Sequence, residues 1–305
     1  MPRRLSYTIA VILLAVAVVL AALGVGEQAG RLTNWQAFTL GIVQGFTELL
    51  PISSSGHLLL VPYLLGWDDP FIESLAFSVV LHAGTLAALL VYFRDDWRRL
   101  VPAGLATLRD RSFQGDPDRR LAWLIAVATI PALIAALLFN DLIEDAIRQA
   151  WLVALTLVVG GVILWLADRY GPRTRRLEGL TFRGATGIGV AQALALIPGV
   201  SRSGISMSAA LFAGLDRADA ARFSFLMATP ITAMAVAYEG LKLVRGEVVG
   251  AEPLTLVVGI VAAFVSGILA ITVLLRYLQT RSFTVFVVYR FVLAAVVLLT
   301  VLVRT

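Results

Sequence analysis

The residues of this sequence that could do chemistry gather in two short polar segments, each inside an apolar stretch. The first segment comprises Gln44, Glu48, Ser53, Ser54, Ser55, Gly56 and His57, and the second comprises Ser201, Arg202, Ser203 and Gly204. An arginine flanked by free backbone N–H groups binds anions, and phosphate in particular. Carboxylates and imidazoles exchange protons, and a serine or a histidine can attack phosphorus. We therefore expect the two segments to form one phosphate-handling site.

Each of these residues also has a structural interpretation that the sequence alone leaves open. Arg202 and Glu48 could form an ion pair that only holds two helices together. Glu48 could instead bind a divalent cation or act as a general acid or base, with Gln44 on the same helical face. His57 could be a nucleophile, base or acid, or only a donor to a nearby carbonyl, and the three serines could cap the following helix. His82, within an apolar run, is interpreted as a satisfied interhelical residue.

An internal repeat relates the two segments. An ungapped shift of 148 residues places Gly41, Ile42, Gln44, Ile52, Ser53, Ser55 and Gly56 on Gly189, Val190, Gln192, Val200, Ser201, Ser203 and Gly204. The chemistry does not repeat, since Ser54, Glu48 and His57 face Arg202, Leu196 and Ile205. We therefore expect the first copy to carry the reacting groups and the second copy to bind the anion.

The composition requires a membrane around these segments. Hydrophobic residues make up 59% of the 305 residues, charged residues 15%, and the mean hydropathy is +0.87. Soluble domains carry about 25% charged residues. The net charge of +5 comes almost entirely from arginines in short loops between apolar runs, which is the positive-inside pattern and not a nucleic-acid-binding surface. The sequence has no cysteine, which excludes disulfides and thiolate metal sites.

Six apolar runs are long enough for a membrane-spanning helix, near residues 72–93, 120–139, 150–168, 222–243, 253–275 and 285–303. Regions 35–66 and 183–213 are each interrupted by Pro, Gly and Ser after about 10 residues, or roughly 15 Å of helix. Each is predicted to be a re-entrant pair of half-helices. An apolar run from about Tyr7 to Val25 is longer than the roughly 7–15 residues of a signal-peptide core, and it is predicted to be a retained anchor.

These elements predict an all-α polytopic membrane protein with two inverted repeats. Residues 1–30 would form the N-terminal anchor, 31–182 the first repeat and 183–305 the second, in one integral membrane domain. Each repeat holds a re-entrant pair and three crossings, and an odd number of crossings inverts the second copy. The loops at 94–119 and 169–183 are rich in arginine and are predicted to be cytoplasmic, which opens the first re-entrant pair to the extracytoplasmic side.

The two polar segments also resemble the signature motifs of a known family. Gln44-x-x-x-Glu48 with Pro51-x-Ser53-Ser54-Ser55-Gly56-His57, and Pro198-Gly199-x-Ser201-Arg202-Ser203-Gly204, resemble the bacterial undecaprenyl-diphosphate phosphatases, known as bacitracin-resistance proteins. The resemblance covers roughly residues 33–303. It implies removal of the terminal phosphate of undecaprenyl diphosphate at the extracytoplasmic side of the bacterial plasma membrane, which recycles the lipid carrier for cell-wall synthesis.

The resemblance also assigns roles. Glu48, Ser54, His57 and Arg202 match essential positions, with Arg202 on the diphosphate, Glu48 on a Mg²⁺ or Ca²⁺ ion or on protons, and Ser54 or His57 as the nucleophile. The remaining residues of the two segments would contact the substrate. Gln44 departs from the family, where many members have Glu, and this weakens a metal site built on two carboxylates.

A transporter or flippase of an anionic polyprenyl-phosphate lipid is the main alternative, since inverted repeats with broken helices are typical of carriers. In that case Arg202 would bind the head group and Glu48 would couple ions. The sequence does not decide between a monomer and a homodimer.

Overall fold

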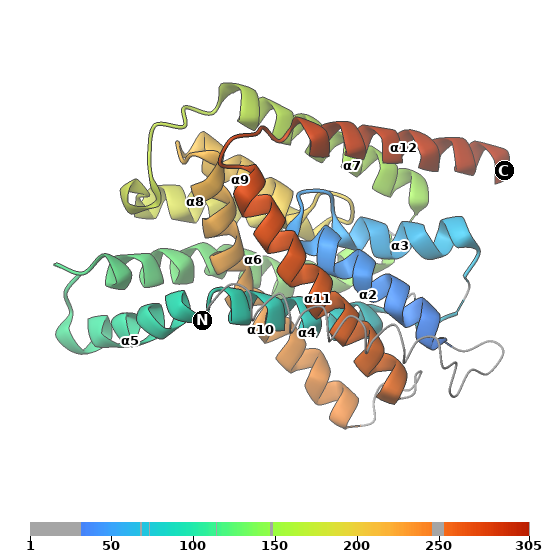
Figure 1. The fold of residues 1–305 in the computed structure, drawn as a ribbon, viewed down its shortest axis with the longest axis horizontal. Coiled ribbons are helices and arrows are strands. Elements are labelled where there is room, and N and C mark those ends of the chain that lie inside the picture. Colours follow the sequence, from blue (N-terminus) through green and yellow to red (C-terminus); the bar gives the residue numbers. More distant parts are fainter. Residues whose placement is uncertain are drawn as a thin grey trace.

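The computed structural model describes residues 32–67, 69–72, 74–113, 115–146, 149–245 and 253–304. Their regular structure is helical (Figure 1), and the helices are α2 Asn34–Leu49, α3 Ser54–Leu65, α4 Leu75–Tyr92, α5 Arg94–Asp110, α6 Pro117–Ala146, α7 Ala150–Tyr170, α8 Phe182–Ala193, α9 Arg202–Phe212, α10 Arg217–Val244, α11 Pro253–Tyr277 and α12 Thr284–Arg304. Two short 3₁₀ turns, Leu177–Gly179 and Leu194–Leu196, flank α8. The predicted N-terminal anchor lies outside the described residues.

Most of the predicted crossings are present. In the described part of the chain, five helices are long and apolar enough to cross a membrane: Pro117–Phe139, Ala150–Tyr170, Arg217–Lys242, Pro253–Tyr277 and Thr284–Val303. The sixth prediction, at 72–93, corresponds to α4, which meets the same criterion only together with α5 as one bent pair. The all-α polytopic class is therefore confirmed.

The loop predicted at 94–119 is wrong, because most of it is helix α5. The chain bends by 82° between α4 and α5 and then continues as a helix to Asp110. Its charged residues pair one turn apart, as Arg98 does with Asp95 and Arg99 with Asp96. Such pairs stabilise a polar helix. Hydropathy alone does not register them, so the segment was predicted as a loop.

Both predicted half-helix pairs are present. The chain reverses after α2, so that α3 packs back along it (Figure 1), and α9 likewise packs against α8. The other main contacts join helices of the first predicted repeat to helices of the second. Helix α2 packs on α11 while α8 packs on α6, α4 contacts α10, and α7 lies beside α12. This pattern is the one expected of paired repeats, and the boundary at 182/183 and the inverted orientation stay predictions.

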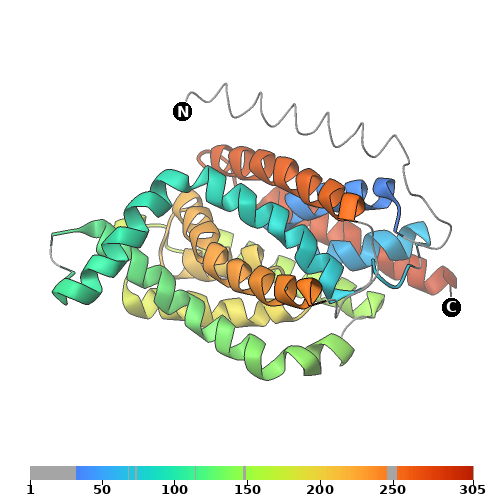
Figure 2. The same ribbon diagram turned by 90° about the horizontal axis from the view of Figure 1, so that it is seen from below.

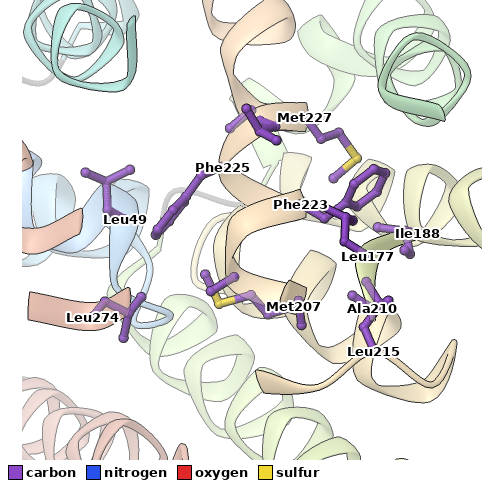
Figure 3. Packing of buried hydrophobic residues seen from close by; sticks show 14 of the residues in the cluster. Leu49, Leu177, Ile188, Met207, Ala210, Leu215, Phe223, Phe225, Met227 and Leu274 are labelled. Carbon is purple, nitrogen blue, oxygen red and sulfur yellow. The ribbon is translucent and has the colours of Figure 1, made fainter. Parts of the chain in front are cut away.

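The main core forms around α10, which passes between α4 and α6 (Figure 2). Phe225 extends from α10 toward Leu49 of α2, whereas Phe223 extends toward Leu177 and Ile188 (Figure 3). All five side chains are buried. Each fully buried residue of this size contributes about 1.5–3 kcal/mol when it leaves water. This packing fixes the end of α2, where the first polar segment begins.

Candidate functional site

The two breaks have the same backbone geometry. Ser53 and Ser201 precede α3 and α9 with φ of 77° and 76°, a region that non-glycine residues rarely adopt. Each serine hydroxyl accepts a hydrogen bond from the backbone N–H three residues later, of Gly56 at 3.3 Å and of Gly204 at 3.1 Å. Both are therefore N-caps of half-helices, one of the roles foreseen for the serines. Strained backbone of this kind is concentrated at functional sites.

The breaks also touch each other. Ser203 Oγ donates to the carbonyl of Leu50 at 3.0 Å, which joins the second break to the first. Arg290 of α12 is fully buried and donates to Pro51 O at 3.3 Å and to Gly199 O at 2.8 Å, one carbonyl in each break. It also donates to Val200 O at 3.1 Å. One guanidinium thus satisfies carbonyls that helix interruption leaves free.

Glu48, at the end of α2, is the centre of the side-chain cluster. Its Oε1 accepts a hydrogen bond and ion pair from Arg202 Nη2, the pair that the sequence suggested. Its Oε2 accepts from Ser54 Oγ and from Gln44 Nε2, the latter at 3.1 Å. Glu48 keeps only 4% of its side-chain surface exposed, so these donors take the place of water around a buried charge. Glu48 therefore joins Ser54, the nucleophile candidate of the first polar segment, to Arg202, the cation of the second.

Arg202 is held in place from a second side. Its Nη1 donates to Thr232 Oγ1 at 2.6 Å and to Ala228 O at 3.2 Å, both on α10. The side chain stays 18% exposed, in contrast to the buried Glu48 behind it. An arriving anion would therefore meet the guanidinium before the carboxylate.

His57 lies in the same first turn of α3 as Ser54 but contacts other groups. Its Nδ1 is 2.6 Å from Ser53 O, and its Nε2 is 2.7 Å from the hydroxyl of Tyr289 on α12. Because a carbonyl only accepts, Nδ1 carries the hydrogen, and Nε2 accepts from the tyrosine. The two rings also stack, with centroids 5.6 Å apart. The expected bond to a break carbonyl is present, and Nε2 is the unprotonated nitrogen, with its lone pair engaged by the Tyr289 hydroxyl.

His82 is a satisfied interhelical residue, as interpreted, but its partner on the other helix is Glu48, so it also lines the site. His82 Nε2 lies 3.2 Å from Glu48 Oε2, and Nδ1 lies 2.7 Å from Ser78 O one turn earlier on α4. The side chain remains 23% exposed. Its apolar neighbours in sequence gave no sign of the site, because they lie on other faces of α4. The contact is with α2, which local sequence cannot reveal.

Comparison of the sequence with known proteins identifies the family of the chain. Residues 37–296 match the family described as bacitracin resistance protein BacA. The chain belongs to this family. A protein named undecaprenyl-diphosphatase from Gemmatimonas aurantiaca is 50% identical over 274 residues, which cover 90% of this chain and 100% of that protein. Proteins of the same name from Thermomicrobium roseum and Desulforudis audaxviator are 45% and 44% identical over 278 and 270 residues, each match covering 88% of this chain and 98% of that protein. The family resemblance is thus confirmed.

The predicted site residues fall into two groups. Glu48, Ser54, Gln44 and Arg202 are joined by direct hydrogen bonds, whereas Ser53, Gly56, Ser201, Ser203 and Gly204 bond within and between the breaks, and Ser55 Oγ lies 3.4 Å from Ser53 Oγ. His57 is bonded to Tyr289 instead of to this cluster. Sequence reasoning missed Tyr289, Arg290, Thr232 and His82. Arg290 had a signal, since a charge inside the apolar run 285–303 is functional by default.

The donors around Glu48 do not fit a resident metal ion held by protein ligands. Both carboxylate oxygens are engaged, Oε1 by Arg202 and Oε2 by three neighbouring side chains. No group of three or more His, Cys, Asp or Glu that could hold a metal occurs among the residues the structure describes. One atom could favour a ligand, since buried Gln44 Oε1 has no hydrogen-bond partner, but a single amide oxygen is no cage. The role of Glu48 toward Mg²⁺ or Ca²⁺ stays a prediction.

Proposed function

We propose that this chain is an integral membrane phosphatase that hydrolyses undecaprenyl diphosphate to undecaprenyl phosphate and inorganic phosphate. Membership in the bacitracin resistance family and the names of its relatives support the substrate. The observation that carries the reaction is local. Ser54 Oγ and Arg202 Nη2 meet on the two oxygens of one carboxylate, Glu48. A phosphate held by Arg202 therefore lies beside a hydroxyl that already donates to a base.

In the first step, Ser54 Oγ attacks the terminal phosphorus of the diphosphate. The hydroxyl proton passes to Glu48 Oε2, the oxygen that it already contacts. The bond between the terminal phosphorus and the bridging oxygen breaks, and undecaprenyl phosphate leaves with the electron pair. Arg202 balances the charge on the transferred phosphoryl group, because preorganised donors stabilise developing charge more than water does. The product of this step is a phosphoserine at position 54.

In the second step, water releases the phosphate. Its oxygen bonds to phosphorus while the bond from phosphorus to Ser54 Oγ breaks, and Glu48 returns its proton to Ser54. The proton lost by water goes to Nε2 of His57, which shares the first turn of α3 with Ser54 and is unprotonated, once the Tyr289 hydroxyl that donates to Nε2 gives way to the water. His57 thus assists the reaction without binding Ser54 in the resting state. No step is assigned to a metal ion.

The hydrogen bond from the Ser54 hydroxyl to Glu48 favours an enzyme over a carrier of the same lipid. A carrier needs a cation for the head group and a group that couples ions, which Arg202 and Glu48 alone would provide. It has no use for a serine aligned on the carboxylate. Ser54 donates to Glu48, and this arrangement is the nucleophile–base pair of covalent catalysis.

A phosphate-release assay with purified protein and undecaprenyl diphosphate tests the proposal. Ser54→Ala and Glu48→Gln should each lower turnover by about 10²–10⁴-fold, the usual contribution of a nucleophile–base pair. Ser208→Ala is the control, because Ser208 is a buried serine that bonds only within α9, to Gly204 O at 2.7 Å. If the wild-type protein releases no phosphate, or if Ser54→Ala is as active as the Ser208 variant, the mechanism is wrong.

We further propose that the protein resides in the bacterial plasma membrane and that the site opens to its extracytoplasmic side. The diphosphate head group would enter the site from there while the lipid tail stays in the bilayer. The alternation of arginine-rich and acidic loops supports this orientation. Because the chain has no cysteine, single cysteines can report it. A membrane-impermeant maleimide should label Pro70→Cys in intact cells and Glu178→Cys only after permeabilisation. The reverse pattern would place the site on the cytoplasmic side.

A further inference from the structure

His82 occupies a position for which the proposed reaction has no role so far. It comes from α4, outside both polar segments, and yet its Nε2 reaches the same carboxylate oxygen as Ser54 and Gln44. Both of its ring nitrogens face acceptors, Glu48 on one side and the carbonyl of Ser78 on the other. His82 is therefore a donor in both directions, and the bond to Ser78 fixes the plane of the ring. Such a double anchorage orients a neighbouring group.

The donors of Arg202 explain why Glu48 needs a second partner. Both terminal nitrogens of Arg202 already donate to protein acceptors, Nη2 to Glu48 and Nη1 to Thr232 and Ala228 O. These bonds use three of the five N–H groups of the guanidinium, so a diphosphate binds through the remaining N–H of Nη2 and through Nε, directly beside Glu48. Glu48 is the acceptor that a second anion repels, so electrostatics favours the loss of that contact. A buried carboxylate that loses one cationic partner and has no second one is destabilised by several kcal/mol.

We propose that His82 is a positioning residue that holds Glu48 when Arg202 turns to the diphosphate. Arg202 contacts Oε1, whereas His82 contacts Oε2, so the two partners bind different oxygens and one can leave while the other stays. Because Ser54 also contacts Oε2, His82 keeps the oxygen that accepts the serine proton in place. The inference rests on the proposed phosphatase function and adds to it a division of labour, with Arg202 for the substrate and His82 for the base.

The exposure of the three side chains agrees with this division. Arg202 and His82 keep 18% and 23% of their side-chain surface exposed, and Glu48 between them keeps 4%. A head group can therefore approach the two donors, while the carboxylate stays behind them. Without His82, Glu48 would retain Arg202 more strongly, and binding of the diphosphate would have to disrupt that pair. Loss of His82 should weaken substrate binding through Glu48 and not by loss of a direct phosphate contact.

A double-mutant cycle on ligand affinity tests the coupling. The probe is a polyprenyl methylenediphosphonate, whose bridging carbon blocks hydrolysis, so that binding is measured without turnover. His82→Leu should weaken probe binding about ten- to hundredfold in the wild-type background, the range of direct side-chain couplings. In the Glu48→Gln background there is no carboxylate to hold, and the same substitution should change binding less than about twofold. Thr85→Val, a buried change one turn away on α4, controls for the integrity of that helix and should leave binding unchanged in both backgrounds.

Each other result overturns the inference. An equal loss in both backgrounds would mean that His82 contacts the phosphate itself or only supports the fold, and the Thr85 control separates these two cases. No loss in either background would mean that Arg202 never leaves Glu48. Failure of the phosphatase proposal is recognised separately, because wild-type protein would then bind the probe but release no phosphate from undecaprenyl diphosphate.

Discussion

Replacing Arg290 with Met should destabilise the protein. The arginine is fully buried and donates to one carbonyl of the first break and two of the second, at 3.3, 2.8 and 3.1 Å. Methionine fills similar space and donates nothing. Each carbonyl left without a partner costs about 1 kcal/mol or more, so the three together cost at least about 3 kcal/mol. The substitution also removes the link between the breaks.

Thermal unfolding of the purified protein in detergent measures this effect. A loss of about 3 kcal/mol corresponds to a lower Tm by roughly 5–10 °C for a chain of this size. Arg290→Lys should fall between wild type and Arg290→Met, since an ammonium lacks the planar fork that reaches both breaks. Arg281→Met changes an exposed arginine just before α12 and serves as the matched control. Its Tm should stay within about 1 °C of wild type, because isolated surface charges contribute little.

The same variants report on the site. Gly199 and Val200, whose carbonyls Arg290 holds, directly precede the strained Ser201 and Arg202, the residue proposed to bind the anion. Phosphate release by Arg290→Met should therefore fall even at temperatures where the protein is folded. If Arg290→Met has the same Tm as the Arg281→Met control and remains active, the breaks hold their geometry without this guanidinium. That result would refute the role of Arg290 in joining the two halves.

Two further predictions concern His57 and the cation. Tyr289→Phe keeps the ring stacked on His57 but removes the hydroxyl that donates to Nε2. The loss of about 1 kcal/mol of hydrogen bonding should lower turnover about fivefold at unchanged Tm. Unaltered turnover would show that His57 does not need this hydrogen bond for its role. Calorimetric titration of substrate-free protein with Mg²⁺ or Ca²⁺ should detect no saturable binding below about 1 mM, because the oxygens of Glu48 are engaged by protein donors. Stoichiometric binding that Glu48→Gln abolishes would contradict this, and would establish a resident metal.

The parts of the fold that the sequence could predict are those set by local chemistry. Pro, Gly and Ser interrupt an apolar stretch wherever they occur, so both breaks were visible at Pro51 and at Pro198. A carboxylate and a guanidinium inside apolar segments must find each other, and this predicted the contact of Glu48 with Arg202. Hydrophobic length located the spans in the same way.

What the sequence could not predict depends on contacts between helices that are distant along the chain. His82 is an ordinary histidine in α4 until α2 places Glu48 against it. Tyr289 reaches His57 across 232 positions of sequence. The prediction for α5 was wrong for the opposite reason. The contacts that stabilise this helix are local in sequence, but the helix is polar. Hydropathy counts its Arg and Asp residues against a membrane-spanning helix and does not register the ion pairs that they form.

The repeat explains how one carboxylate comes to lie between a serine hydroxyl and a guanidinium. Ser53 and Ser201 have nearly equal φ and cap equivalent glycines, so the residues that follow them, Ser54 and Arg202, leave their breaks in equivalent directions. Because the breaks are in contact, both of these side chains reach Glu48. Duplication of a backbone therefore presents two equivalent side-chain positions to one point, and a difference of residue type at those positions is enough to place a hydroxyl and a guanidinium on the same carboxylate. A symmetric pair, two serines or two arginines, would supply only one of the two groups that the proposed transfer requires.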